Sequence, residues 1–273
     1  MILLDGQKLA KSKELELKDK VSNLDSVPSL VVIQVGDNSA SNSYIRVKKK
    51  FGSRIGVQVL IHKFSEDISE DILLEAINYC NQDISVGGII VQLPLPNHIN
   101  KNKLINQIKD SKDVDGLGLI NGGKLLKEDF TAKLPATPKG IVTLLKDYNI
   151  KIEGQNVVIV GRSKLVGLPL FILLVHENAT VTLTHSHTKN LADITSKADI
   201  LISACGKPNF ITSEYVKNDA VVIDVGSTFI DSKITGDVDF NAVFDKVKAI
   251  TPVPGGVGPM TVYSLFDNLL ESL

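Results

Sequence analysis

Apolar and polar positions alternate between a strand-like and a helix-like period along this chain. Continuous apolar runs, such as SLVVIQV at 29–35 and GGIIVQ at 87–92, are typical of strands buried on both faces. Residues 40–55 and 69–81 instead carry apolar side chains at helical spacing. Strands that alternate with helices predict an α/β fold whose mainly parallel sheets are covered by helices on both faces.

The same patterns predict the other elements. In the first half we expect helices over 6–24 and 101–108 and a strand over 58–64, with Ser69 or Asp71 capping the helix at 69–81. In the second half we expect a helix that has Thr137 as its N-cap and Pro138 at its first position. The other expected strands are 155–160, 180–184, 200–204, 220–225 and 247–250, and the other expected helices are 168–176, 191–196 and 261–273.

The second half has the strand–loop–helix–strand order of a doubly wound, Rossmann-like nucleotide-binding domain. A segment rich in Gly and Asp, residues 113–126, indicates the passage between two domains. We therefore expect two domains, with the boundary near residue 116.

The composition is consistent with two packed cores and argues against binding of nucleic acid or of anionic membranes. The 273 residues are 43% hydrophobic and 22% charged, which is ordinary for globular proteins. The formal net charge of −1 offers no electrostatic basis for binding nucleic acid or an anionic membrane. Arg46, Lys48, Lys49 and Lys50 form a local basic run, which is typical of a solvated helix face.

Cysteine and histidine usage predicts a reducing compartment and no metal site. Cys80 and Cys205 are far apart and form no CxxC pair, so no disulfide framework is expected. His185 and His187 have no further ligand nearby in the sequence. The N-terminus is charged almost from its start, and the most apolar run, 167–175, is too short to span a bilayer. We expect a soluble cytoplasmic protein.

Residues 251–261, TPVPGGVGPMT, combine prolines, which fix φ, with glycines, which let a ligand approach the backbone. The segment lies between a strand pattern and the last helix pattern, where loops often hold ligands. A tight turn without a site is the alternative that its composition leaves open.

A second loop, Gly161 to Gly167, follows a predicted strand and precedes a helix, which is where a pyrophosphate commonly binds. Its two glycines permit the turn and the close approach of the helix. The spacing is not GxGxxG, so a plain turn remains open. The next strand ends in Thr184-His185-Ser186, without the acid that binds the ribose of NAD. Ser186 and Arg162 are suited to a 2′-phosphate, so the sequence predicts NADP.

Five blocks in this order resemble the bifunctional methylenetetrahydrofolate dehydrogenase/cyclohydrolase family. They are SNSYIRVK at 41–48, VQLPLP at 91–96, KDVDG at 112–116, GRS at 161–163 and TPVPGGVGPMT at 251–261. The resemblance implies oxidation of 5,10-methylenetetrahydrofolate to the methenyl cation with NADP, then hydrolysis to 10-formyltetrahydrofolate. It also implies a homodimer formed through the nucleotide-binding domains. In the fold that the resemblance implies, an αβ domain comprises residues 1–116 and 260–273, a Rossmann-like domain comprises residues 117–259, and a cleft lies between them.

The resemblance assigns roles to four residues. Tyr44 packs against the folate, and Lys48, one helical turn later, is the catalytic group. Gln92 hydrogen-bonds Lys48, and Asp115 holds the amino-pyrimidine edge of the pterin. Without the resemblance, an exposed Tyr–Lys pair, a structural Gln and an Asp-Gly turn are the ordinary interpretations.

The other expected contacts lie partly within these blocks and partly outside them. Val91 and Leu93 accompany Gln92 against the folate, and the folate is also walled by Pro252, Pro254, Gly255 and Gly256. The cofactor is expected at Thr137, Gly161, Arg162, Ser163, Ser186 and Ser227.

The chain departs from the family pattern at three places. Ala136 stands where Cys is common, Leu117-Gly118-Leu119 replaces an aromatic followed by His-Pro, and Ser227-Thr228 replaces Ile-Asn. Three alternatives therefore stay open. They are a dehydrogenase with weak or no cyclohydrolase activity, a catalytically silent nucleotide-binding module, and a small-acid dehydrogenase, which does not explain the N-terminal blocks.

Overall fold

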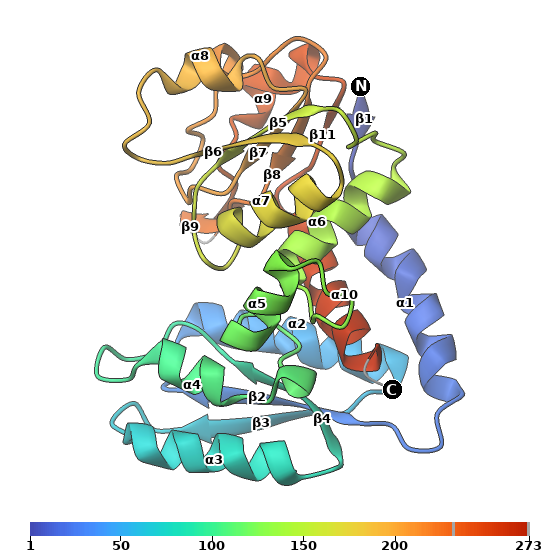
Figure 1. Cartoon of the computed structure of the whole chain (residues 1–273), viewed down its shortest axis with the longest axis vertical. Helices are drawn as coiled ribbons and strands as arrows, with labels where there is room; N and C mark the ends of the chain where they lie inside the picture. Colours follow the sequence, from blue (N-terminus) through green and yellow to red (C-terminus); the bar gives the residue numbers. More distant parts are fainter. Residues whose placement is uncertain (231–232, 272–273) are drawn as a thin grey trace. The chain divides into compact units, whose positions relative to one another are not determined.

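The computed structural model describes residues 1–230 and 233–271, without the side chain of Ala40. Contacts divide the chain into two compact units (Figure 1). We call residues 12–136 with 262–273 the three-stranded unit, and residues 1–11 with 137–261 the six-stranded unit. Both have mainly parallel sheets with helices, so the predicted two-domain α/β fold class is confirmed.

The unit ranges differ from the predicted domain ranges at three places, of which the smallest is residues 260–261, which fall in the six-stranded unit. The first residues belong to the six-stranded unit because Ile2 and Leu3 form a strand, β1, that pairs with Ala249 and Ile250. Residues 117–136 belong to the three-stranded unit, and the chain passes to the other unit at the start of helix α6.

The three-stranded unit has the strand order β3-β2-β4, all parallel. Its core residues alternate between the two faces of β2. Val31, Ile33 and Val35 face a cluster that contains Leu73 and Ile77 of α3. Helix α2 lies on the opposite face (Figure 1), where the rings of Phe51 and Phe266 stack with centroids 5.0 Å apart. Its elements, including the two helices shared with the other unit, are α1 (Gly6–Ser22), β2 (Ser29–Val35), α2 (Ser39–Ile55), β3 (Val59–Phe64), α3 (Glu70–Gln82), β4 (Val86–Val91), α4 (Lys101–Gln107), the 3₁₀ turn η1 (Asp110–Lys112), α5 (Leu119–Leu126) and α10 (Val257–Leu270).

The six-stranded unit has the strand order β1-β11-β8-β7-β5-β6 within the described residues, all parallel. The chain runs from β5 to β6 on one side and then to β7 on the other, so the order reverses at β5. A reversal of this kind is where doubly wound folds bind dinucleotides, outside the carboxyl ends of the strands. Its elements are β1 (Ile2–Leu3), α6 (Ala136–Asp147), β5 (Asn156–Val160), α7 (Gly167–His176), β6 (Thr180–Thr184), α8 (Leu191–Thr195), β7 (Ile200–Ser203), η2 (Ser213–Tyr215), β8 (Val221–Asp224), β9 (Thr228–Ile230), β10 (Lys233–Thr235), α9 (Phe240–Val243), η3 (Phe244–Lys246) and β11 (Ala249–Ile250).

Some predicted boundaries are wrong. Helix α6 begins at Ala136, so Thr137 lies inside its first turn and is not the N-cap. Helix α10 begins at Val257, four residues before the predicted start at Thr261, so the expected loop ends at Gly256. Pro259 therefore lies in the first turn of a helix. N–H groups in the first turn have no intrahelical partner, so the lack of an N–H in proline costs no hydrogen bond there.

The segment at 113–126 is not irregular throughout, because residues 119–126 form α5. The helix contains the Gly122-Gly123 pair, which the pattern did not mark as helical. Its N-terminal end is anchored by hydrogen bonds from the Leu117 and Gly118 N–H groups to the Asp113 carboxylate, at 3.3 and 2.8 Å. Among the described residues, every helix is too short or too polar to span a bilayer.

Candidate active site

Lys48 and Gln92 form a buried pair in the three-stranded unit. The Lys48 amine donates to Gln92 Oε1 at 2.8 Å, and the two residues are only 9% and 8% exposed. Gln92 follows β4 directly, and its N–H donates to the Ile33 carbonyl at 2.9 Å, so its backbone continues the sheet. The predicted solvated face is therefore wrong for Lys48, although Lys49 and Lys50 are exposed.

Helix α2 is held firmly where it carries these side chains. Asn38 caps it, with Oδ1 accepting from the Ser41 N–H at 3.0 Å. The Ser41 hydroxyl donates to the Leu93 carbonyl at 3.2 Å, and Gln92 Nε2 donates to the same carbonyl at 2.9 Å. The end of β4 and the start of α2 thus share one hydrogen-bonded corner.

Asp115 is electrostatically coupled to Lys48. Burial raises the pKa of Asp115 to about 6, against the lowering effect of the Lys48 charge. Burial lowers the pKa of the Lys48 amine, and the Asp115 charge opposes that shift. The structure thus brings Lys48, Gln92 and Asp115 together from α2, the end of β4 and the loop after η1. Asp115 itself keeps part of its surface exposed.

Tyr44 lies on α2 one turn before Lys48 and is 40% exposed. Residues four apart share a helix face, so an exposed ring and a buried amine address the same side of α2. Val91 is buried in β4, whereas Leu93 is half-buried at its end.

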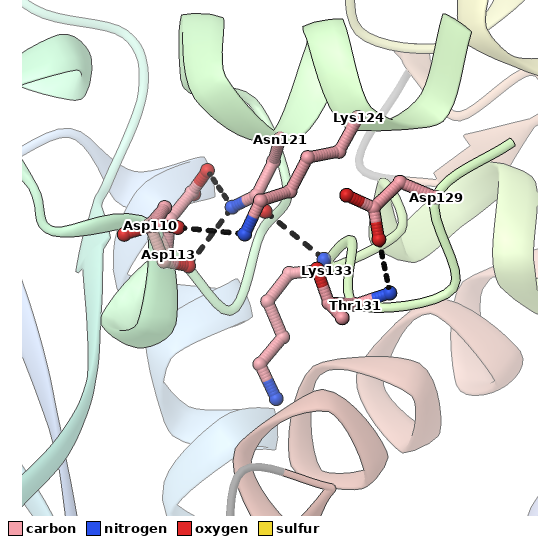
Figure 2. A network of polar contacts seen from close by, with 7 residues as sticks. All are labelled: Asp110, Asp113, Asn121, Lys124, Asp129, Thr131 and Lys133. Atoms are coloured by element: carbon pink, nitrogen blue, oxygen red, sulfur yellow. Dashed lines mark hydrogen bonds and ion pairs between the residues drawn. The ribbon is translucent and has the colours of Figure 1, made fainter. Parts of the chain in front are cut away.

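A polar network fixes the loop that carries Asp115 (Figure 2). Asp113 is only 1% exposed, and its Oδ2 accepts from the Asn121 amide at 3.0 Å. Asn121 also donates to the Asp110 carbonyl at 2.9 Å and accepts from the Lys133 N–H at 3.0 Å. Burial raises the pKa of Asp113. Lys124 closes the network by pairing with Asp110 at 2.8 Å.

The last helix extends this support. The Lys133 amine donates to the Asn268 carbonyl, and the Asn268 amide donates to the Val114 and Leu134 carbonyls, both at 2.8 Å. Gly116 has φ +67°, and a Cβ there would lie 2.6 Å from the Lys133 carbonyl oxygen. Sequence reasoning missed Asp113, Asn121, Lys133 and Asn268, because only the tertiary structure brings these segments together.

The loop after β5 in the six-stranded unit requires both of its glycines. Gly161 has φ +122°, and a Cβ there would lie 2.3 Å from the Ala204 carbonyl oxygen. A Cβ on Gly167 would lie 1.9 Å from the Gly161 carbonyl oxygen. The predicted tight turn and close helix approach are confirmed. The loop precedes the N-terminus of α7, so its backbone suits a pyrophosphate.

The predicted cofactor side chains follow different strands of this sheet. Arg162 and Ser163 come after β5, Ser186 after β6 and Ser227 after β8, and all four are exposed. The Ser163 hydroxyl also accepts from the Val166 N–H at 3.2 Å, which shapes the turn. In contrast, the half-buried Thr137 hydroxyl pairs with the Thr261 hydroxyl at 3.0 Å.

The proline-rich segment after β11 is anchored at both ends. The Thr251 side chain is buried and accepts from the Asp224 N–H at 2.7 Å. Gly255 has φ +109°, and its carbonyl accepts from the Gln7 N–H at 2.8 Å. Pro252 is half-buried, Pro254 is exposed and Gly256 is buried.

The reversed strand order and the Gly161–Gly167 loop together define a two-unit α/β protein with one Rossmann-like, dinucleotide-binding unit. Residues 4–115 match the catalytic-domain model of the tetrahydrofolate dehydrogenase/cyclohydrolase family, and residues 135–273 match its NAD(P)-binding-domain model. The chain belongs to this family, which confirms the resemblance inferred from the five blocks.

Individual relatives agree over nearly the whole chain. It is 49% identical to the bifunctional protein FolD of Francisella philomiragia, across 99% of this chain and 98% of that protein. The bifunctional FolD structure from Campylobacter jejuni superposes with a TM-score of 0.98 at 44% identity, covering 100% of this chain and 98% of that one. The Trypanosoma brucei FolD structure, complexed with NADP cofactor and inhibitor, superposes with a TM-score of 0.95 at 34% identity, covering 100% of this chain and 97% of that one.

Proposed function

We propose that the chain oxidises 5,10-methylenetetrahydrofolate to 5,10-methenyltetrahydrofolate with NADP and then hydrolyses the product to 10-formyltetrahydrofolate. It is a bifunctional dehydrogenase and cyclohydrolase of one-carbon folate metabolism. The observation that carries the proposal is the buried Lys48–Gln92 pair, whose amine interacts electrostatically with Asp115. The same chain also has the loop from Gly161 to Gly167 that suits a pyrophosphate.

Lys48 is the acid–base group of the hydrolysis. An ordinary lysine is protonated at neutral pH, but burial lowers the pKa of this one. A cationic methenyl substrate beside it lowers that pKa further, because like charges disfavour each other. The neutral amine takes a proton from the attacking water, and the ammonium then returns it to the ring nitrogen. Gln92 Oε1, at 2.8 Å, holds the amine in place.

Asp115 and Tyr44 bind the folate. A carboxylate accepts two N–H bonds from an amino-pyrimidine edge, and the network around Asp113 and Asn121 keeps the Asp115 loop in one conformation. The exposed ring of Tyr44 offers an apolar face to the pterin or its neighbouring ring. Val91, Leu93, Pro252, Pro254, Gly255 and Gly256 remain predicted folate contacts.

The dehydrogenase step depends on positioning, since the adjacent folate nitrogen supplies the electrons that expel hydride. Bound NADP supplies the hydride acceptor. The close contacts that a Cβ would make at Gly161 and Gly167 support a tight turn just before α7, and a turn at a helix N-terminus suits a pyrophosphate. Arg162 and Ser186 hold the 2′-phosphate, and Ser163, Thr137 and Ser227 remain predicted contacts of the cofactor.

A spectrophotometric assay tests this function. Methylenetetrahydrofolate is offered with NADP or NAD, and methenyl formation is followed separately from its decay. We expect formation with NADP and decay of added methenyl substrate without any cofactor. Formation without decay would instead support a dehydrogenase that lacks cyclohydrolase activity, which the intact Lys48–Gln92 pair argues against. Absence of both reactions would support the silent nucleotide-binding module.

The homodimer and the cytoplasmic location stay proposals. The antiparallel pair β9–β10 exposes Phe229 and Ile230, at 47% and 42%, on the six-stranded unit. Apolar side chains on a small exposed sheet favour burial against a second copy. Sedimentation of wild type and of Phe229→Ser tests this, because loss of a dimer is expected only for the variant. Cysteine usage is the support for a reducing compartment.

A further inference from the structure

Two buried carboxylates of the six-stranded unit lie outside the residues assigned to the folate and the cofactor. Asp224 ends β8 and is 4% exposed, and Asp237 lies just before α9 and is 0% exposed. Burial of an ionised carboxylate is costly unless hydrogen bonds compensate it. Both residues therefore need a structural or functional reason.

Asp224 ties the loop after β8 to the segment at 237–238. Its Oδ1 accepts from the Gly226 and Asp237 N–H groups, and its Oδ2 accepts from the Val238 N–H, each at 2.9 Å. A Cβ on Gly236 would lie 2.0 Å from Asp224 Oδ2, so the neighbouring chain is packed directly against the carboxylate.

Asp237 ties the segment after β7 to the same place. Its Oδ2 accepts from the Cys205 N–H at 2.8 Å, the Gly206 N–H at 3.1 Å and the Ser203 hydroxyl at 3.2 Å. Its Oδ1 is buried without a hydrogen-bond partner among the described residues. That oxygen lies against Gly226, where a Cβ would be 2.5 Å away.

The two carboxylates thus hold the chain where β7 and β8 end. These strands are parallel neighbours, with Ser203 opposite Asp224. The pyrophosphate loop follows β5 and the predicted 2′-phosphate contact at Ser186 follows β6, on the other side of the strand-order reversal. A dinucleotide that crosses a reversal of this kind places its second half over the carboxyl ends of β7 and β8.

We propose that Asp237 is a positioning residue of the dehydrogenase. Its Oδ2 fixes the backbone at Cys205 and Gly206, and through Asp224 the pair also fixes Gly226, so that both strand ends form a rigid support for the nicotinamide half of NADP. The inference rests on the proposed function. It concerns residues that act on the cofactor through the backbone and do not touch the reacting atoms.

The variant Asp237→Asn tests the carboxylate with little change of shape. The amide oxygen can still face the three donors, but charge-assisted hydrogen bonds are roughly twice as strong as neutral ones. The amide NH₂ then takes the place of Oδ1, which has no hydrogen-bond partner among the described residues. We expect NADP to bind about 10-fold more weakly by titration calorimetry, and dehydrogenase kcat/KM to fall about 10- to 100-fold.

Hydrolysis of added methenyl substrate, measured without cofactor, separates positioning from simple destabilisation. The candidate hydrolysis residues all lie in the three-stranded unit, so Asp237→Asn should hydrolyse methenyl substrate within about twofold of wild type. Asp239→Asn is the matched control. Asp239 caps α9, with Oδ1 accepting from the Ala242 N–H at 3.1 Å, and should leave NADP binding unchanged.

Three outcomes decide the proposal. Weaker NADP binding with intact hydrolysis supports it. Parallel loss of both activities with a lowered Tm, or unchanged NADP binding, overturns it. If Asp237→Asn does not fold, Ser203→Ala removes one donor to Asp237 and should weaken NADP binding several-fold, and wild-type binding in that variant overturns the proposal. A wild-type chain that binds no NADP refutes the proposed function itself, independently of Asp237.

Discussion

Replacement of Lys48 by methionine separates the two activities most sharply. Methionine has a similar length and no amine, so it fills the buried site without offering a proton. The substitution removes the donor that Gln92 Oε1 holds at 2.8 Å, while β4 and α2 keep their own contacts at the Ser41–Leu93 corner.

The magnitudes predict a large kinetic effect and a small effect on stability. General acid–base catalysis contributes about 10²- to 10⁴-fold, so methenyl hydrolysis should fall by that factor. Leaving the Gln92 oxygen without its donor costs about 1–3 kcal/mol. Removing the lysine offsets part of this cost, because its lowered pKa means that the folded state disfavours the ammonium.

The assay follows the decay of purified methenyl substrate without cofactor, next to methenyl formation from methylenetetrahydrofolate with NADP. We expect Lys48→Met to lose decay and to retain formation at a measurable rate. Lys50→Met is the control, since Lys50 is exposed on the same helix and should behave as wild type. Hydrolysis at the wild-type rate in folded Lys48→Met would refute the role of Lys48.

Three further predictions test the other parts of the site. Arg162→Ala should raise KM for NADP at least about 10-fold and leave KM for NAD nearly unchanged, because only NADP carries the 2′-phosphate; equal losses for both would contradict the assignment. Asp115→Asn should raise KM for the folate. The pKa of about 6 means that folded wild type binds the Asp115 proton more tightly than the unfolded chain does. The free energy of unfolding of wild type should therefore fall, by at most about 3 kcal/mol, as pH rises from about 4 to 6. Asp115→Asn cannot titrate there and should not show this fall. Denaturant unfolding at both pH values measures this difference, and identical pH profiles would contradict it. Gly167→Ala should weaken NADP binding at least about 10-fold, since its Cβ would lie 1.9 Å from the Gly161 carbonyl oxygen, whereas Gly122→Ala meets nothing within 4 Å and is the control.

Strongly periodic segments were predictable because their burial is uniform along the strand or helix. The run at 29–35 is buried at every position and forms β2 with the predicted bounds. Weak local signals failed. Strand β1 has two residues and exists because β11 offers an edge. Among the described residues, β9 and β10 pair only with each other. Helix α5 was not predicted because it contains the Gly122-Gly123 pair. Its N-cap residue, Gly118, donates its N–H to the Asp113 carboxylate, which lies outside the helix.

Some features of the candidate site were also predictable from the sequence, and others depended on the tertiary structure. The sequence by itself indicated the residue types that we propose for the chemistry, because Tyr44, Lys48, Gln92, Asp115 and Gly161 stand in blocks of distinctive order. Only the tertiary structure decided that Lys48 is buried while Lys49 and Lys50 are exposed, and that Asn121, Lys133 and Asn268 support the Asp115 loop. Burial and long-range hydrogen bonds depend on which distant segments pack together, so a local pattern does not contain the lowered pKa of Lys48 or the carboxylate pair of Asp224 and Asp237.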